Sequence, residues 1–148
     1  MARLELIWNP FDPFDPGPRI DVMITNSSDL IDAGRSIGLE YPEPRPIKAL
    51  LDTGASVTVV SKAFANYCKL RQTNAGREIR GLGAINKCGE HAGTISFPNT
   101  LLKSFDTIPI VSAEFKQEPH YACLIGRDIL MHWRVTFDGQ SKRVIIID

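Results

Sequence analysis

The sequence predicts a mostly β protein, a barrel or sandwich of short strands with one or two short helices. Three observations predict it: runs rich in β-branched residues recur along the chain, turn-forming residues separate them, and only two segments have helical spacing. The length of 148 residues fits one domain that can bury a core, and 43% hydrophobic with 23% charged residues is ordinary for a globular protein.

Composition excludes several classes of protein. The 17 basic and 17 acidic residues balance, so we expect no nucleic-acid partner and no binding to an anionic membrane. No apolar run is long enough to cross a bilayer and the N-terminus lacks the apolar centre of a signal peptide, so we expect a cytoplasmic protein. The cysteines Cys68, Cys88 and Cys123 are odd in number and not closely paired, which argues against a disulfide scaffold and against zinc.

The N-terminal segment differs in texture from the rest of the chain. Residues 1–18 are predicted to form an acidic, proline-rich arm before a single domain at 19–148. Within the arm, Leu4, Leu6 and Trp8 give an imperfect strand alternation. The triplet Phe-Asp-Pro then occurs twice, and its prolines disfavour both a helix and a β-ladder.

Charge is distributed unevenly along the chain. Residues 1–32 carry two basic and six acidic groups, whereas residues 61–90 carry six basic and two acidic groups. The simplest interpretation is two solvated faces of opposite sign. The alternative is that the acidic arm docks onto the basic middle of the chain.

The predicted elements begin with a strand at 19–25, which ends at a turn-forming Asn-Ser-Ser sequence. Residues 29–38 are predicted to be a loop, because Gly34 and Gly38 interrupt the segment. The proline-rich residues 41–46 are predicted to be an extended connector.

After the connector the sequence predicts mainly short strands. A strand at 47–51 leads into an Asp-Thr-Gly sequence, and Ser61 is placed to cap a short helix at 62–69. A polar turn is predicted at 86–89, between two of the strands. The remaining predicted elements are strands at 57–60, 78–85, 91–97, 107–111, 121–125, 135–138 and 144–147, and a helix at 128–133.

Asp52-Thr53-Gly54 is the motif that carries chemistry. Three residues alone are a weak signal, since an Asp-x-Gly turn after a strand is common. Here, however, apolar runs precede and follow it, which places one carboxylate between two buried strands. Burying a carboxylate is costly unless the group is paired, hydrogen-bonded or functional.

Three motifs in order resemble those of the retroviral-type, or retropepsin, aspartic proteases. They are Ala49-Leu50-Leu51-Asp52-Thr53-Gly54-Ala55, then Ile79-Arg80-Gly81-Leu82-Gly83, then Leu124-Ile125-Gly126-Arg127-Asp128-Ile129-Leu130. The resemblance covers about residues 20–148. The short helix after the motif looks more like the retroviral-type domain of DNA-damage-inducible shuttle proteins than like viral enzymes. The chain departs from viral enzymes in its long segment before the motif.

The resemblance implies a closed acid-protease barrel that is active as a two-fold homodimer and hydrolyses peptide or protein substrates, with no cofactor and no metal. Such chemistry uses two carboxylates around one water, one acting as base and one as acid. The chain has one Asp-Thr-Gly, and Asp138-Gly139 is predicted to be a hairpin turn. We therefore expect Asp52 from each subunit to form the catalytic pair.

The family pattern also implies roles around this pair. Thr53 would hydrogen-bond across the two-fold axis, Gly54 would let backbone approach the substrate, and Gly126 would let its strand pass behind the motif. Arg127 would make a structural ion pair or hydrogen bond. Ala55 lacks the hydroxyl found there in pepsins, which implies a weakly acidic pH optimum.

The second motif resembles a flap, a glycine-rich hairpin that closes over the substrate. Gly81 and Gly83 would give it mobility, Leu82 would present its amide, and Ile79 would contact the substrate. Apolar residues here and beside the motif suggest a preference for hydrophobic side chains at the cleaved bond.

The apolar C-terminal run at 143–148 predicts a strand that pairs back on 134–138, and a partner chain is expected to cover its other edge; the alternative is an edge strand paired only within the chain. A second function remains open, a dimerisation or peptide-binding module with this fold but little hydrolysis. His91, His120 and His132 are scattered and predicted to have surface or packing roles.

Overall fold

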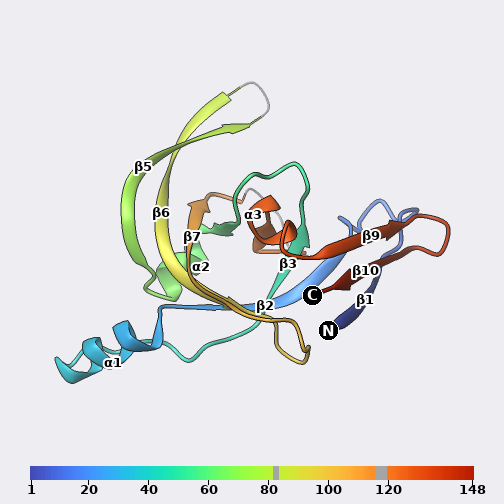
Figure 1. Cartoon of the computed structure of the whole chain (residues 1–148). Coiled ribbons are helices and arrows are strands. Elements are labelled where there is room, and N and C mark those ends of the chain that lie inside the picture. Colours follow the sequence, from blue (N-terminus) through green and yellow to red (C-terminus); the bar gives the residue numbers. More distant parts are fainter. Residues whose placement is uncertain (82–83, 116–119) are drawn as a thin grey trace.

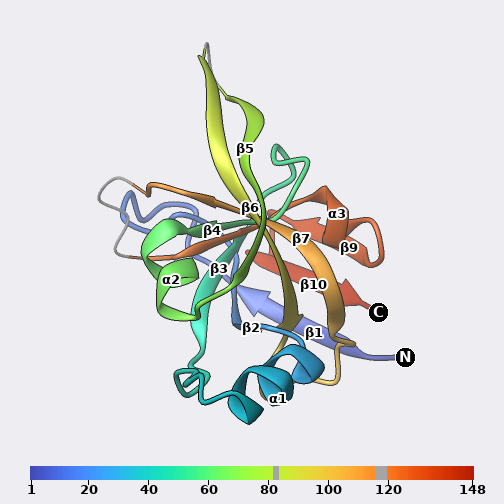
Figure 2. The same ribbon diagram turned by 90° about the vertical axis from the view of Figure 1, so that its left-hand side faces the viewer.

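The computed structural model describes residues 1–81, 84–115 and 120–148, and over these residues the chain forms two sheets and three short helices (Figures 1 and 2). In chain order the elements are β1 (Arg3–Ile7), β2 (Arg19–Thr25), α1 (Ser28–Ser36), β3 (Ile47–Leu51), β4 (Val59–Ser61), α2 (Lys62–Tyr67), β5 (Arg71–Gly81), β6 (Ala84–Ser96), β7 (Phe105–Ala113), β8 (Cys123–Ile125), α3 (Arg127–Leu130), β9 (Arg134–Asp138) and β10 (Arg143–Ile147). The mostly β prediction is confirmed. Among the described residues, no helix is both long and apolar enough to cross a bilayer.

The larger sheet has seven strands in the order β2-β3-β8-β4-β7-β6-β5. β3 and β8 are parallel, and so are β4 and β7, whereas the other neighbours are antiparallel. β2 also pairs with β6, so the sheet bends back on itself. At its far edge, β5 and β6 form a long curved hairpin that projects away from the rest of the molecule (Figure 1).

The smaller sheet has the order β1-β10-β9. The predicted return of the C-terminal strand onto 134–138 is confirmed, with Val144 opposite Phe137. The expectation that a partner chain covers its other edge is wrong, because β1 pairs there in the same chain, with Leu6 opposite Val144. The arm continues beside this sheet, because Trp8 donates its N–H to the Lys142 carbonyl at 3.3 Å and the Lys142 ammonium lies over the Phe11 ring. The acidic arm therefore packs near the β9–β10 turn and not on the basic residues 61–90.

The helix α1 corrects the loop predicted at 29–38. Ser27 caps it by accepting a hydrogen bond from the backbone N–H of Leu30 at 3.3 Å, and the chain leaves it at Gly38 with a φ of 87°. Gly34 makes room for Tyr41, because a Cβ there would lie 2.3 Å from the hydroxyl oxygen of Tyr41 and would force that side chain to move. The glycines that suggested a loop therefore mark a contact and a helix end.

The hairpin β5–β6 corrects a second prediction. The polar residues 86–89, expected to form a turn, continue strand β6, and pairing extends to Gly81 opposite Ala84. The strand predicted at 78–85 is divided between the two strands of the hairpin, since β5 begins at Arg71 and ends at Gly81 and β6 begins at Ala84. The other predicted strands and the helices α2 and α3 lie near their predicted positions, with ends shifted by a few residues. α2 has the expected cap, because Ser61 accepts a hydrogen bond from the N–H of Phe64 at 3.2 Å.

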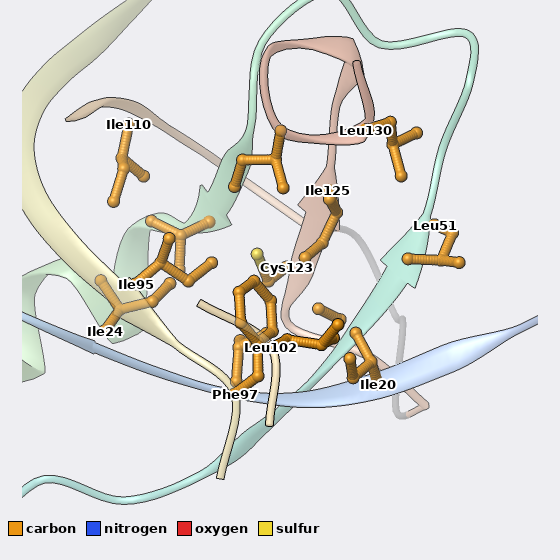
Figure 3. Packing of buried hydrophobic residues seen from close by; sticks show 14 of the residues in the cluster. Ile20, Ile24, Leu51, Ile95, Phe97, Leu102, Ile110, Cys123, Ile125 and Leu130 are labelled. Atoms are coloured by element: carbon orange, nitrogen blue, oxygen red, sulfur yellow. The ribbon is translucent and has the colours of Figure 1, made fainter. Parts of the chain in front are cut away.

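The core lies where the larger sheet bends around β8 (Figure 3). Isoleucines from β2, β6, β7, β8 and the helix α3 are at most 1% exposed: Ile24, Ile95, Ile110, Ile125 and Ile129. Burying one such side chain contributes about 1.5–3 kcal/mol. Val144 and Ile146 of β10 are also fully buried in this core, so the smaller sheet is part of the same folding unit.

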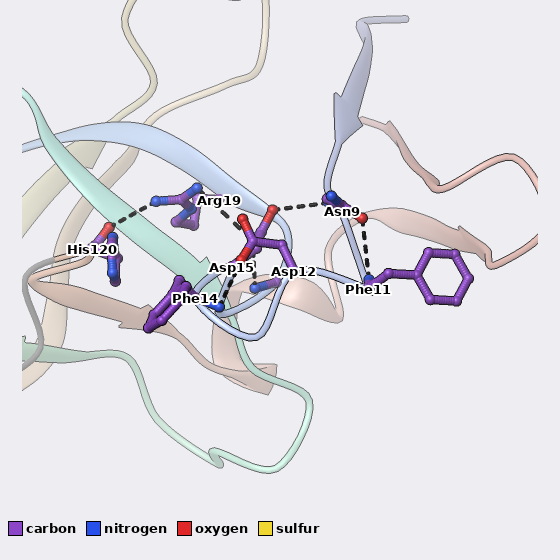
Figure 4. A network of polar contacts seen from close by, with 8 residues as sticks. Asn9, Phe11, Asp12, Phe14, Asp15, Arg19 and His120 are labelled. Atoms are coloured by element: carbon purple, nitrogen blue, oxygen red, sulfur yellow. Dashed lines mark hydrogen bonds and ion pairs between the residues drawn. The ribbon is translucent and has the colours of Figure 1, made fainter.

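The arm between β1 and β2 is held by a series of side-chain-to-backbone hydrogen bonds (Figure 4). Asp15 lies at its centre and accepts the N–H of Asn9 at 2.9 Å and that of Gly17 at 3.0 Å, one on each carboxylate oxygen. These backbone bonds hold the pKa of Asp15 below its usual range. Repeated Asx turns thus give an ordered conformation to a segment whose prolines prevent a helix or a strand.

Candidate active site

Asp52 lies at the end of β3, where the chain leaves one neighbour of β8 to return as the other neighbour, β4. The backbone N–H of Asp52 donates to the carbonyl of Ile125 at 3.0 Å, which extends the β3–β8 pairing up to the carboxylate-bearing residue. The side chain itself is half-buried. The pairing with β8 therefore fixes the backbone position from which the Asp52 carboxylate projects.

Backbone N–H groups of the loop after Asp52 donate hydrogen bonds back to Asp52. Gly54 donates its N–H to Oδ1 of Asp52 at 2.9 Å, and Ala55 donates its N–H to the Asp52 carbonyl at 3.2 Å. A Cβ at Gly54 would lie 3.1 Å from the same Oδ1, so glycine permits the first of these bonds. Thr53 and Gly54 are exposed, and the outer side of the loop is therefore accessible beside the carboxylate.

Helix α3 holds this loop from the other side. Arg127 donates its backbone N–H to the Ala55 carbonyl at 2.8 Å and a guanidinium N–H to the Thr53 carbonyl, also at 2.8 Å. The residue is thus anchored to both ends of the short turn. Its guanidinium contacts a backbone carbonyl, and among the described side chains it has no ion pair.

Asp128 and Thr58 form the second contact between α3 and the loop. The Asp128 carboxylate accepts the Thr58 backbone N–H at 2.9 Å and the Thr58 hydroxyl at 2.8 Å. The Thr58 hydroxyl oxygen in turn accepts the N–H of Gly126 at 3.2 Å. The sequence motifs gave Thr58 no role and included Asp128 only as a member of the third motif; a hydroxyl residue within the apolar run after Asp-Thr-Gly was the usable signal.

At Gly126, the end of β8 comes very close to the loop that carries Asp52. A Cβ on this residue would lie 2.5 Å from the carbonyl carbon of Val57 and 2.6 Å from its oxygen. Backbone at this distance cannot move aside without moving the loop that carries Asp52. The glycine therefore sets how closely β8 and α3 approach the loop.

The β5–β6 hairpin supplies an apolar contact to the same region. Ile79 and Cys88, which are half-buried, pack against Val57, Val59 and Val111. Gly81 lies at the end of β5 with open space around it. Of the residues predicted for a flap, Ile79 and Gly81 thus belong to this hairpin, whereas Leu82 and Gly83 lie outside the described residues.

The other predicted side-chain roles can be located as well. Asp138 lies at the β9–β10 turn, where its Oδ1 accepts the N–H groups of Gln140 and Ser141, both at 3.1 Å, which confirms the predicted hairpin. The hydroxyl and N–H of Ser141 hold the pKa of Asp138 below its usual range. Across residues 1–81, 84–115 and 120–148, no three side chains of His, Cys, Asp or Glu gather in a way that could hold a metal ion.

Burial separates the three cysteines. Cys68 and Cys123 are buried, as predicted, and Cys88 is half-buried on β6. Burial raises the pKa of Cys68 to about 11 and raises the pKa of Cys123 further still. His91 has a structural position too, buried between β5, β6 and β7.

Comparisons with known proteins agree with this geometry. The family model described as retroviral aspartyl protease matches residues 15–138. A crystal structure of a retropepsin-like aspartic protease from Rickettsia conorii aligns with a TM-score of 0.59 at 16% identity, over 97% of this chain and 89% of that one. EIAV protease complexed with the inhibitor HBY-793 aligns with a TM-score of 0.52 at 21% identity, over 85% of this chain and 93% of that one. At these identities the two structures show a shared fold.

Proposed function

Because the chain belongs to the retroviral aspartyl protease family, we propose that it is an aspartic endopeptidase in which two copies each contribute Asp52. One observation carries the proposal: a half-buried carboxylate is fixed at a strand end, in a loop whose next two residues, Thr53 and Gly54, are exposed. The family match covers this loop and the hairpin beside it.

The proposed chemistry needs a second carboxylate beside the first. Asp138, in the Asp138-Gly139 pair, is used in the β9–β10 turn on the other sheet. A second copy of the chain is therefore the source that we propose, with the two Asp52 side chains sharing one proton and one attacking water. Thr53, exposed on each loop, would hydrogen-bond across the two-fold axis.

The C-terminal strand is not part of the proposed contact between copies. Both edges of β10 are paired within the chain, and two of its side chains are fully buried. We propose that the copies meet at their Asp52 loops. The free edges of β1 and β9 in the described structure leave room for further pairing between the smaller sheets.

The substrate would be an extended polypeptide held between the Asp52 loop and the β5–β6 hairpin, which would act as the flap. Backbone hydrogen bonds would give general affinity, and apolar pockets would select side chains. Ile79, Val57 and Val59 support a preference for hydrophobic residues at the cleaved bond. The short helix α2 supports a relation to the protease-like domain of the shuttle proteins.

The proposal is tested by turnover of quenched-fluorescence peptides at decreasing protein concentration. Wild-type protein should hydrolyse them with a specific activity that falls when sedimentation shows that dimers dissociate. Asp52→Asn should abolish hydrolysis while preserving the fold, and Asp138→Asn is the matched control that should retain it. Peptide binding without hydrolysis by wild-type protein would instead favour the binding-module alternative.

A further inference from the structure

A cavity of about 620 Å³ is lined by the β5–β6 hairpin, the helix α2 and the end of β7. Its volume falls within the range of about 300–1,000 Å³ that is usual for ligand sites. Asp52 does not line it, and its walls differ in chemistry from the apolar surroundings of the Asp52 loop.

The cavity and the region that follows the Asp52 loop share residues of the hairpin. Ile79 lines the cavity and also packs against the apolar cluster of Val57, Val59 and Val111, two of which follow shortly after the Asp52 loop. Gly81 at the end of β5 lines it as well. An extended peptide that runs beneath the hairpin would therefore pass this cavity several residues away from the bond at Asp52.

The lining of the cavity includes a buried polar pair, His91 and Ser112. His91 Nδ1 lies 3.3 Å from the carbonyl oxygen of Leu70, which only accepts hydrogen bonds, so this nitrogen carries a proton. Its Nε2 lies 2.9 Å from the hydroxyl oxygen of Ser112. A Cβ on Gly89 would lie 3.0 Å from that oxygen, so the glycine keeps space open above a buried polar pair. An apolar occupant would gain little here.

The charged side chains that line the cavity indicate which charge a bound group should carry. Lys62 and Lys87 contribute two positive charges, and Glu114 contributes one negative charge. Glu114 is 77% exposed and its carboxylate lies 4.0 Å from the Lys62 ammonium, which makes a weak ion pair. Lys87 is opposite Glu78 in the strand register, but no ion pair joins them in the described structure and Glu78 is not part of the lining.

We propose that this cavity is a distal substrate subsite that receives an acidic side chain, Asp or Glu, of the extended peptide. The inference rests on the proposed function, because the peptide is placed by the Asp52 loop and the hairpin. Lys62 and Lys87 would attract the carboxylate, and the amides of Asn66 and Asn86, which also line the cavity, would donate hydrogen bonds. The acidic arm of the chain lies elsewhere and does not fill the cavity.

The test uses quenched-fluorescence peptides that share one cleaved core and carry Glu, Gln or Lys at the third, fourth or fifth residue from the cleaved bond. At one of these positions, kcat/KM for the Glu peptide should exceed that for the Gln peptide by about threefold to tenfold at low salt. The double variant Lys62→Gln/Lys87→Gln should bring the ratio close to one. Lys62→Glu/Lys87→Glu should reverse the preference toward the Lys peptide. Lys103→Gln removes an exposed lysine outside the cavity and should leave the ratio unchanged.

Dye-labelled versions of the same peptides, bound to Asp52→Asn and followed by fluorescence anisotropy, separate the two proposals. Preferential binding of the Glu peptide that depends on Lys62 and Lys87, with no hydrolysis by wild-type protein, would support the cavity and contradict the endopeptidase. Hydrolysis with equal kcat/KM for Glu and Gln peptides at all three positions would overturn the subsite and leave the endopeptidase standing.

Discussion

The carboxylate of Asp128 accepts two hydrogen bonds from Thr58, one from its backbone N–H at 2.9 Å and one from its hydroxyl at 2.8 Å. Asp128 lies in the first turn of the helix α3, and Thr58 lies at the end of the loop that starts at Asp52. Two side chains that are 70 residues apart in the sequence thus fix the helix to the loop. Thr58 is fully buried, so loss of either bond would leave a polar group unsatisfied.

Replacing Asp128 should therefore affect both stability and activity. We expect Asp128→Ala to lower the free energy of unfolding by about 2–3 kcal/mol, because it removes a charged acceptor from buried donors. Urea denaturation measures this change. Peptide turnover should fall mainly in kcat, because the Asp52 loop loses its support. Asp128→Asn keeps one acceptor oxygen and should fall between wild type and Asp128→Ala; equal stability of all three would contradict this role.

Gly126→Ala should be more disruptive than its size suggests. The new methyl group would meet backbone atoms of Val57 at 2.5 and 2.6 Å, so the Asp52 loop must shift. We expect a loss of about 2 kcal/mol or more in unfolding free energy, together with loss of hydrolysis. Gly139→Ala is the matched control, since nothing lies within 4 Å of its Cβ position. A fully stable Gly126→Ala protein would show that the close approach is not required.

Asp15→Asn should loosen the arm in a pH-dependent way. The Asn9 and Gly17 N–H groups each donate to a separate Asp15 oxygen, and asparagine would turn an amide donor toward one of them. We expect a loss of about 1 kcal/mol at pH 7 in urea denaturation. Because the folded pKa of Asp15 is lowered, its stabilising effect is present above the unfolded value of about 3.9 and is lost as pH falls through the folded value.

The difference between wild type and Asp15→Asn should accordingly shrink toward pH 2. Asp12→Asn is the control, because Asp12 accepts with Oδ1 alone, from Phe14 N–H at 2.9 Å, and asparagine can replace that oxygen. An equal loss in the two variants, or a loss that persists unchanged at pH 2, would contradict the assignment.

Thiol labelling should separate the three cysteines. The thiolate is the reactive form, and burial raises the pKa of Cys68 to about 11 and that of Cys123 higher. We expect N-ethylmaleimide at pH 8 to add one label to the folded protein, located at Cys88 by peptide mass spectrometry. Cys88→Ser should remove that label. Rapid labelling of Cys68 or Cys123 under native conditions would contradict the burial seen here.

Ala55→Ser should move the pH profile of hydrolysis. A serine hydroxyl at this position would donate a hydrogen bond to a catalytic carboxylate and favour its charged form. We therefore expect kcat/KM of the wild type to be highest at weakly acidic pH and that of Ala55→Ser to be highest at lower pH. Ala55→Gly adds no donor and should not move the profile toward acid. A shift of Ala55→Ser toward higher pH would refute the explanation.

Local sequence signals predicted many elements because the determining interactions are local. The cap of α2 depends on Ser61 and Phe64, three residues apart, and the β9–β10 turn depends on Asp138 and its next residues. The prediction missed α1 because Gly34 and Gly38 indicated a loop, whereas in the structure Ser27 caps the helix and Gly34 makes room for Tyr41. The prediction placed a turn at 86–89, inside the strand β6, because these residues are polar. In the structure they continue the strand along the exposed part of the hairpin.

The sequence by itself determined that the chain is mostly β, that Asp52-Thr53-Gly54 follows a buried strand, and that the three motifs occur in family order. Only the tertiary structure decided which strand covers the second edge of β10, how Asp128 and Thr58 hold the loop, and that Lys62 and Lys87 share one cavity. The physical reason is that periodicity and capping act over a few residues. Strand pairing, close packing and cavity walls join residues that are far apart in the chain, and no local pattern specifies such partners.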